Sequence, residues 1–150
     1  MDDSLRNSIN EIETKVIGHK RYLFDQVRKK WLIDTPEERV RMQCVQYLIS
    51  QVNVPKTWIL IEHQIKLHNT TKRVDILVKN KNQTNFLMVE CKSPSVKITS
   101  KKIIAQIIRY VNDGIECDYY MITNGEESYF FTYSSKNGNH EFLSHLPLYQ

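Results

Sequence analysis

Glycines, cysteines and long apolar runs are scarce in this 150-residue sequence, and each shortage excludes a class of protein. The four glycines are scattered and the phosphate-binding pattern G-x-x-x-x-G-K-[ST] is absent, which excludes a nucleotide-driven motor within the chain. The three cysteines are widely spaced without a C-x-x-C pair, so they indicate neither a zinc site nor a redox disulfide. No apolar run approaches the ~18 residues that cross a bilayer, and the polar, acidic N-terminus differs from a secretory signal. We therefore expect a cytoplasmic protein without a membrane partner.

The length and composition are those of one globular domain. Hydrophobic residues make up 41% of the chain and charged residues 25%, which leaves no case for a disordered or fibrous protein. The net charge of +4 is modest and by itself a weak indication of a nucleic-acid partner. Residues 1–33 are weakly patterned and favour one or two helices. We predict a single domain over residues 1–150, with a helical extension at 1–33 and a core at 34–150.

Strong helix and strand signals alternate after residue 34. Thr35 is typical of an N-cap residue, Pro36 of the first helical position, and Glu38 completes a capping box, so a helix should run to about Ile49. Apolar, β-branched runs then predict strands, and a stripe of isoleucines predicts a second helix. The expected order is helix 35–49, strands 58–66, 73–79 and 85–91, helix 99–111, and strands 118–123 and 128–133. This is an αβββαβ core of the α/β class, in which helices flank a central mixed sheet.

The middle hairpin places two acids and a lysine together. Apolar side chains sort onto both faces when Asp75 lies opposite Glu90, a register that also sets Ile76 against Val89. The opposed carboxylates would be ~5 Å apart at Cβ and would repel each other, so something must compensate. A divalent cation such as Mg²⁺ does so naturally, since it takes oxygen ligands from one or two carboxylates, water and phosphate. Lys92 follows on the same face, where its ammonium would orient water and offset negative charge in a phosphoryl-transfer transition state.

A purely structural reading of this hairpin stays open. The same register opposes Arg73 to Lys92, so Asp75 would find an ordinary ion-pair partner in either residue on an exposed sheet face. The run Val89-Glu90-Cys91-Lys92 is also short enough to occur by chance. Against this reading, the strands around Asp75 and Glu90 are apolar enough to be central, and a charge there is costly unless it is paired or metal-bound.

The first helix offers one further carboxylate. At about 100° per residue, Glu37 lies on the stripe of Val40, Cys44 and Leu48, whereas Glu38 lies at its edge. Because Glu38 is expected to serve in capping, Glu37 is left to point inward. The alternative is that both are ordinary first-turn acids, which the helix dipole favours.

The second helix adds polar and basic side chains. Gln106 and Tyr110 are four residues apart and share one face, where they would contact a phosphate, the lysine or simply the rim of the core. Between Cys91 and Asn112 the sequence has five basic residues and no acidic one. This pattern is typical either of a solvated helix face or of contacts with a phosphate backbone. The five are Lys92, Lys97, Lys101, Lys102 and Arg109.

Together these residues resemble the PD-(D/E)XK nucleases related to the N-terminal domain of type I restriction enzyme R subunits, in particular the small stand-alone members. The resemblance spans about residues 20–150. The D…(D/E)XK core alone is unspecific, but its ordered combination with P-E-E-x-V-R and QxxxY is considerably more specific. In order, the motifs are Tyr22 to Asp25, Arg28 to Trp31, Thr35 to Arg41, Lys72 to Asp75, Val89 to Lys92, Gln106 to Tyr110 and Ile122 to Gly125.

This resemblance implies a restriction-endonuclease-like fold and a DNA-cleaving activity in restriction, defence or DNA processing. Hydrolysis of the phosphodiester bond would depend on Mg²⁺, with Mn²⁺ as a substitute. Asp75, Glu90 and the backbone carbonyl of Cys91 would bind the metal, and Lys92 would be the catalytic lysine.

The same resemblance assigns supporting roles. A helix glutamate, Glu37 or Glu38, would complete the acidic set, while Gln106 and Tyr110 would assist positioning. The side chains expected to contact DNA are Arg73, Lys97, Lys101, Lys102 and Arg109.

Some functions stay open at this point. The full R subunit carries a helicase motor that this chain lacks, so ATP-driven translocation is not expected. Because a nuclease fold does not by itself establish turnover, the alternative function is a catalytically silent nucleic-acid-binding or assembly module. A third reading is cleavage of RNA or branched DNA. A double-strand cut would need two active sites, which a homodimer or a larger restriction-type complex would supply.

Overall fold

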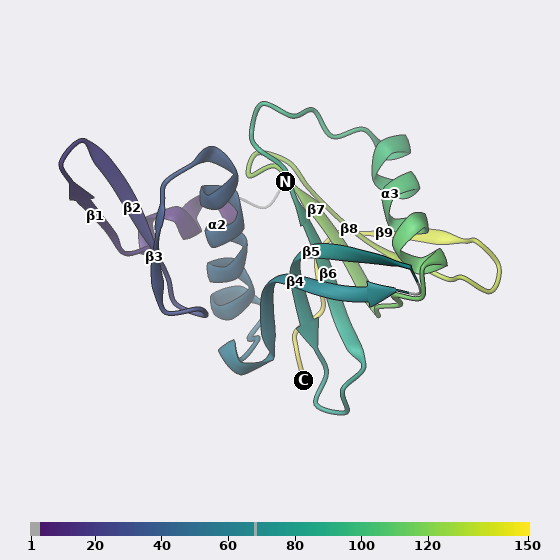
Figure 1. Ribbon diagram of the computed structural model, residues 1–150. Helices are drawn as coiled ribbons and strands as arrows, with labels where there is room; N and C mark the ends of the chain where they lie inside the picture. Colours follow the sequence, from purple (N-terminus) through teal and green to yellow (C-terminus); the bar gives the residue numbers. More distant parts are fainter. Residues whose placement is uncertain (1–3, 68) are drawn as a thin grey trace.

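The computed structural model describes residues 4–67 and 69–150, and within them a long helix lies between two β-sheets. Figure 1 shows this helix, α2 (Pro36–Gln51), between a three-stranded sheet and a larger six-stranded sheet. A second helix, α3 (Ser100–Asn112), packs on the opposite face of the larger sheet. The larger sheet is therefore covered on both faces, which explains why its central strands are apolar on both sides.

The six-stranded sheet has the mixed topology that the sequence predicts. Neighbouring strands pair antiparallel except β6 and β7, which are parallel because α3 connects them as a crossover. From α2 to β7 the chain follows the expected αβββαβ order, and this architecture is compatible with a restriction-endonuclease-like fold. A sixth strand and a short 3₁₀ helix, η2 (Lys56–Trp58), were not predicted. In spatial order the strands are β4 (Ile59–Leu67), β5 (Thr70–Lys79), β6 (Asn85–Cys91), β7 (Tyr119–Thr123), β8 (Ser128–Tyr133) and β9 (His140–Leu143).

Helix α2 begins at the residues that signal its start. The Thr35 hydroxyl accepts a hydrogen bond from the Glu38 N–H at 3.2 Å, and Pro36 is the first helical residue. The second half of the predicted capping box is absent, because the Glu38 carboxylate binds Arg41 and the Thr35 N–H donates to Ile33. No helix within the described residues has both the length and the apolarity needed to cross a bilayer.

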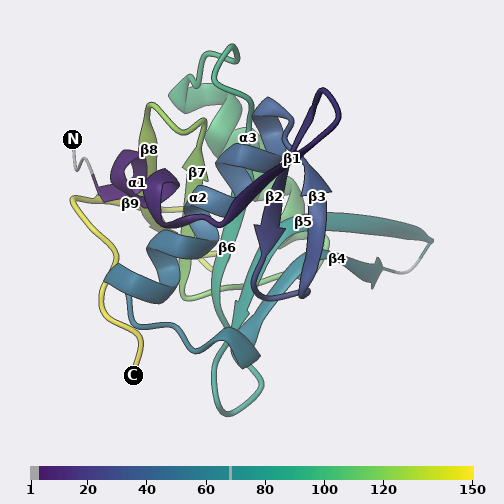
Figure 2. The same cartoon turned by 90° about the vertical axis from the view of Figure 1, so that its left-hand side faces the viewer.

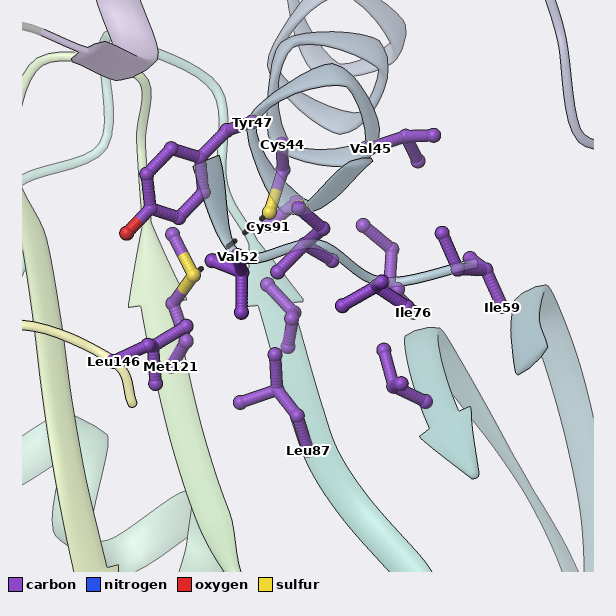
Figure 3. Packing of buried hydrophobic residues seen from close by; sticks show 14 of the residues in the cluster. Cys44, Val45, Tyr47, Val52, Ile59, Ile76, Leu87, Cys91, Met121 and Leu146 are labelled. Carbon is purple, nitrogen blue, oxygen red and sulfur yellow. Dashed lines mark hydrogen bonds between the residues drawn. The ribbon is translucent and has the colours of Figure 1, made fainter. Parts of the chain in front are cut away.

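Two apolar clusters hold the helices on the large sheet. Figure 3 shows the first, in which Cys44 and Tyr47 of α2 lie over Leu87 and Met121 of the sheet. The Cys44 thiol approaches the Met121 sulfur to 3.8 Å. The second cluster lies on the other face of the sheet, under α3. The buried stripe of α3 consists of Ile103, Ile107 and Val111.

Residues 14–33 form an antiparallel three-stranded sheet, so the prediction that the N-terminal extension is helical is wrong for this segment. Two positive-φ residues turn the chain between its strands, Gly18 at φ +63 and Lys29 at φ +54. The central strand β2 is only six residues long and includes charged residues, so a search for apolar periodicity does not detect it. Helical turns occur only before the sheet. The elements are α1 (Ser4–Asn7), η1 (Ser8–Glu11), β1 (Thr14–Ile17), β2 (Lys20–Asp25) and β3 (Lys30–Ile33).

The inner face of this N-terminal sheet packs on α2. Leu23 and Asp25 of β2 are fully buried, and Leu23 belongs to the same apolar cluster as Val40 and Cys44 of α2. Helix α2 is consequently enclosed from two sides. This enclosure buries not only its apolar stripe but also the side chain of Arg41, which is 4% exposed.

Candidate active site

Asp75 lies where β5 and β6 separate. The register pairs Ile76 with Val89, as predicted, and the ladder stops there. Beyond this point a side chain replaces the backbone as hydrogen-bond acceptor, since Asp75 Oδ2 accepts a hydrogen bond from the Cys91 N–H at 2.8 Å. The negative charge of Asp75 also acts on Glu90, the residue before Cys91. The two predicted acids therefore come together at the end of two central strands.

The predicted opposition of Arg73 and Lys92 does not form. Arg73 pairs with Gln64 on β4, and the Lys92 backbone N–H donates to the Thr123 carbonyl on β7 at 2.9 Å. Strand β5 thus stays with β4 while β6 continues beside β7. Asp75 and Lys92 flank the point at which the strands diverge.

Glu90 is a buried carboxylate paired with Lys92. Its Oε1 accepts a hydrogen bond from the lysine Nζ at 3.0 Å, and its side chain is 13% exposed. Burial is the largest cause that raises the pKa of Glu90, and the charge of Asp75 raises it further, while Lys92 opposes the rise. Burial works to lower the pKa of Lys92, but the hydrogen bond and charge of Glu90 outweigh it, so this pKa is raised. The lysine is therefore a cation at neutral pH, beside two acids.

The predicted helix residues Gln106 and Tyr110 lie at the same centre. Both are half-buried on α3, and hydrogen bonding from Gln106 lowers the pKa of Glu90 and of Tyr110. Burial followed by the charge of Glu90 nevertheless raises the pKa of Tyr110. The Tyr110 hydroxyl lies 3.5 Å from the Arg73 carbonyl, which is long for a hydrogen bond. The Glu90 carboxylate is thus a neighbour of both Gln106 and Tyr110.

Arg41 connects α2 to Asp75. Its Nη2 lies 3.1 Å from Asp75 Oδ1, and its Nη1 donates to the Glu38 carboxylate. Burial by itself would lower the pKa of Arg41, but the charges and hydrogen bonds of Glu38 and Asp75 raise it above its usual value. The partner of Asp75 is therefore a buried, permanently charged guanidinium, whereas the sequence suggested Lys92 or Arg73.

The helix carboxylate in this centre is Glu38, and the prediction that Glu37 points inward is wrong. The Glu38 side chain is 19% exposed, while that of Glu37 is 57% exposed and only approaches Arg41 to 3.4 Å. Arg41 stands one helical turn after Glu38 and draws its carboxylate inward. Glu38 Oε2 is buried without a hydrogen-bond partner among the described residues and lies 3.9 Å from Arg28 Nη2.

A further acid and a second arginine extend the cluster towards the N-terminal sheet. Arg28, in the turn between β2 and β3, places its Nη1 2.7 Å from Glu62 Oε2 and its Nε on the buried Asp25 carboxylate. Glu62 Oε1 also lies 3.5 Å from Arg41 and 3.1 Å from Arg73. Burial tends to raise the pKa of Glu62, but the hydrogen bond from Arg28 and the charges of all three arginines lower it below its usual value.

The backbone of Glu62 is strained. Its φ of +51 lies in the left-handed region, and it stands across from Asp75 at an irregular rung between regular pairs of β4 and β5. For a residue other than glycine such a conformation costs on the order of 1 kcal/mol or more, and strain of this kind is common at functional sites. The irregular rung carries two of the acids in the cluster.

The basic residues predicted to contact DNA are exposed, and several of them border a pocket beside Lys92. The pocket has a volume of about 430 Å³ and lies between the segment 92–99 and α3. Lys101 is exposed outside it, and Arg73 is 63% exposed and bound to Glu62. The predicted residues that line the pocket are Lys92, Lys97, Lys102, Gln106 and Arg109.

The described residues contain no group of three or more His, Cys, Asp or Glu side chains placed to hold a metal ion. The smaller set of Asp75 and Glu90 still fits a hard cation, because carboxylate and backbone oxygens are the ligands that Mg²⁺ prefers. The Asp75 carboxylate bonds to the N–H of Cys91, the residue after Glu90, which places the two acids at the same strand end. The Cys91 thiol is buried in hydrogen-bonding contact with Cys44, so only its backbone carbonyl would serve as a ligand.

Sequence reasoning missed Arg28, Arg41 and Glu62. The signal for Arg41 was available, since it stands three residues after Glu38 and at the end of the P-E-E-x-V-R motif. The burial of Arg28 depends on a sheet that was not predicted, and nothing in the sequence distinguishes Glu62 from an ordinary exposed strand residue.

A comparison with known families matches residues 36–147 to the model described as type I restriction enzyme R protein N terminus. This range contains every predicted site residue, and it begins just after the N-terminal sheet. The expected resemblance to the N-terminal domain of type I restriction enzyme R subunits is thereby confirmed over residues 36–147. No curated protein matches the chain.

Proposed function

Because this chain belongs to the family of type I restriction enzyme R protein N termini, we propose that it hydrolyses phosphodiester bonds in DNA with the help of a divalent cation. The observation that carries the proposal is the convergence of Asp75, Glu90 and Lys92 at one strand end. The proposed cation is Mg²⁺, with Mn²⁺ as a substitute, held by Asp75, Glu90 and the carbonyl of Cys91. When bound, it would polarise the scissile phosphate and lower the pKa of a water molecule.

The side chains of this chain supply the remaining chemistry. Lys92 is kept protonated by Glu90, so its ammonium is available to donate to a phosphate oxygen and to stabilise the charge that develops in the transition state. Gln106 of α3 bonds to the Glu90 carboxylate and would hold it in position, while Tyr110, which also bonds to Gln106, would assist. Glu38 binds Arg41, and Arg41 in turn holds the Asp75 carboxylate in position.

The proposed substrate path is the pocket beside Lys92. Its basic lining is suited to backbone phosphates, which are contacts that carry no sequence information. We propose that Lys97, Lys102 and Arg109 hold the phosphates next to the one that is cleaved, and that Lys101 and Arg73 contact the flanks. The proposed setting is the cytoplasm, where the protein would act as a homodimer or within a larger restriction-type complex.

The test is cleavage of plasmid, linear and single-stranded DNA with Mg²⁺ or Mn²⁺. Asp75→Asn, Glu90→Gln and Lys92→Ala should each lower the rate by about 1,000-fold or more, because each removes a group needed in the transition state. Glu141→Gln and Lys81→Ala change exposed residues of β9 and of the loop between β5 and β6, and serve as matched controls. Intact substrates after prolonged incubation of the wild-type protein would count against the proposal.

Metal binding gives a second readout that does not depend on turnover. In calorimetry, Mn²⁺ should release heat with the wild-type protein and not with Asp75→Asn, while Glu37→Gln should bind as the wild type does. Equal binding by the Asp75 variant would place the cation elsewhere.

Two observations favour a second function. Arg41 already neutralises Asp75, and the described residues lack a three-ligand group. In a catalytically silent nucleic-acid-binding or assembly module, this ion pair would have a purely structural role. It predicts DNA binding that weakens with salt, because phosphate contacts release counterions, and that is unchanged in Asp75→Asn.

A further inference from the structure

The N-terminal sheet has an outer face that no family match explains, since residues 14–33 lie outside the matched range of 36–147. Residues paired across a sheet share a face, and Leu23 and Asp25 define the inner one. The alternate residues point away from α2. Figure 2 views the molecule from the side on which this sheet lies. We define the outer face as Lys15, Lys20, Tyr22, Phe24 and Trp31, with Ile17 and Ile33 at its rim.

Aromatic rings occupy the middle of this face. Phe24 and Trp31 are cross-strand partners whose ring centroids are 5.1 Å apart. Lys15 Nζ lies 4.2 Å from the centroid of the Trp31 ring, a cation–π contact. Tyr22 is the cross-strand partner of Lys15, and all four side chains are half-exposed. A flexible lysine thus covers one side of the tryptophan, and it can be displaced by another planar group.

The sheet carries a large excess of positive charge. Residues 14–33 contain six basic side chains and a single acidic one, Asp25, which is buried and paired with Arg28. Lys20 of the outer face is exposed, and so are Lys29 in the turn and Lys30, which pairs with Asp25 at an inner-face position. Two acids flank the sheet: Glu13, which is exposed before β1, and Asp34, whose side chain is buried after β3 and lies 3.4 Å from Arg21. Such a surface is complementary to a polyanion.

The same sheet abuts the candidate active site. Arg28, in the turn between β2 and β3, bonds to Glu62 of the acidic cluster. The Phe24–Trp31 pair lies one rung from that turn, next to the pair formed by Asp25 and Lys30. A chain molecule lying along the outer face would therefore reach the acidic cluster at one end of the sheet.

We propose that the outer face of the N-terminal sheet binds single-stranded DNA. Unpaired bases stack on aromatic rings such as Trp31 and Tyr22, and the lysines contact the phosphates between them. A duplex hides the faces of its bases and would leave the rings without a role. A protein partner fits less well, because lysines are depleted in protein interfaces. One part of the proposal rests on the proposed function, namely that the bound DNA strand would continue into the candidate active site.

The test measures binding without cleavage. Labelled single-stranded and duplex oligonucleotides of equal length are titrated, in EDTA, against the full chain carrying Asp75→Asn. The single strand should bind more tightly than the duplex. Trp31→Ala and Lys20→Glu should each weaken binding of the single strand by about 10-fold, as expected for loss of one stacked base or for reversal of one phosphate contact.

Two controls match the variants in type. Phe142→Ala removes an exposed aromatic ring from β9, and Lys136→Glu reverses an exposed charge before it, so both should bind as the parent does. Lys20→Glu leaves the ring cluster untouched and keeps the test valid if Trp31→Ala loosens the sheet. Unchanged binding in both sheet variants, equal losses in the controls, or a preference for duplex would each overturn the proposal. Since no metal is present, these outcomes are independent of whether the protein hydrolyses DNA.

Discussion

The two regions on either side of residue 36 differ in whether they match a known family and in how well their structure could be predicted from the sequence. The region 36–147 matches a family model and folds in the order that its apolar pattern predicts. The N-terminal sheet, residues 14–33, lies outside the match and folds contrary to prediction. Yet both contribute charged side chains to one cluster, in which Arg28 of the first region binds Glu62 of the second. A region outside the matched range is thus built into the site that the matched region carries.

The difference also shows what each region contributes to that site. The matched region supplies the acids and the lysine, whereas the N-terminal sheet supplies Leu23 and Arg28, which enclose α2 and hold Glu62. Burial of Arg41 depends on both, since α2 lies between the two sheets. The comparison can therefore be sharpened by substitutions at the points where the regions meet.

The largest effect on stability is expected from Arg41→Met. Removing one partner from a buried ion pair leaves carboxylates uncompensated, which costs about 3 to 5 kcal/mol in the free energy of unfolding. Arg41 holds Glu38 and Asp75 in this way. Urea denaturation measures the loss. The control is Arg6→Met, because Arg6 and its partner Glu126 are 53% and 56% exposed, so losing this surface pair should cost less than about 1 kcal/mol. Equal costs for the two variants would mean that the acids of the cluster do not depend on Arg41.

A smaller effect, about 3 kcal/mol, is expected from Leu23→Ala, which opens a cavity between the N-terminal sheet and α2. If the two regions fold as one unit, the whole unfolding transition shifts to lower urea concentration. Ile33→Ala changes an apolar residue of the same sheet that is 50% exposed, and it should shift the transition little. If hydrogen exchange rises only in residues 14–33 and the midpoint of urea unfolding is unchanged, the N-terminal sheet unfolds independently of the matched region.

The matched region could be predicted because its strands are central. Two-sided burial makes β5 and β6 continuous apolar runs, and period-two geometry then brings Asp75, Glu90 and Lys92 to one end. The same reasoning fails in β2, whose inward positions include Arg21 and Asp25 as well as an apolar residue. The short edge strand β9 carries too little apolar pattern to be recognised.

The arginines at the site escaped prediction for a related reason. A stripe analysis assumes that a helix is covered on one side, and Arg41 lies outside the stripe of Val40, Cys44 and Leu48. Helix α2 is covered by two sheets, so its buried surface is wider than one stripe. Glu37 was favoured over Glu38 because Glu38 was expected to serve in capping, although the exposed fractions of their side chains are 57% and 19%. The wrong choice of acid came from the capping role, because the Glu38 carboxylate binds Arg41 instead.

The smallest effect is the most direct measure of how the two regions are joined. Arg28→Met and Glu62→Gln, alone and together, form a double-mutant cycle whose coupling energy should be about 1 kcal/mol at neutral pH. The exposed pair Arg6 and Glu126 is the control, with a coupling below about 0.5 kcal/mol. Because the pKa of Glu62 is lowered in the folded protein, the coupling is fully present above the ordinary glutamate pKa and is lost as the pH falls through the lowered one. Urea denaturation at a series of pH values measures both quantities. A coupling no larger than that of the surface pair, or one that does not fall with pH, would mean that the N-terminal sheet merely rests against the site.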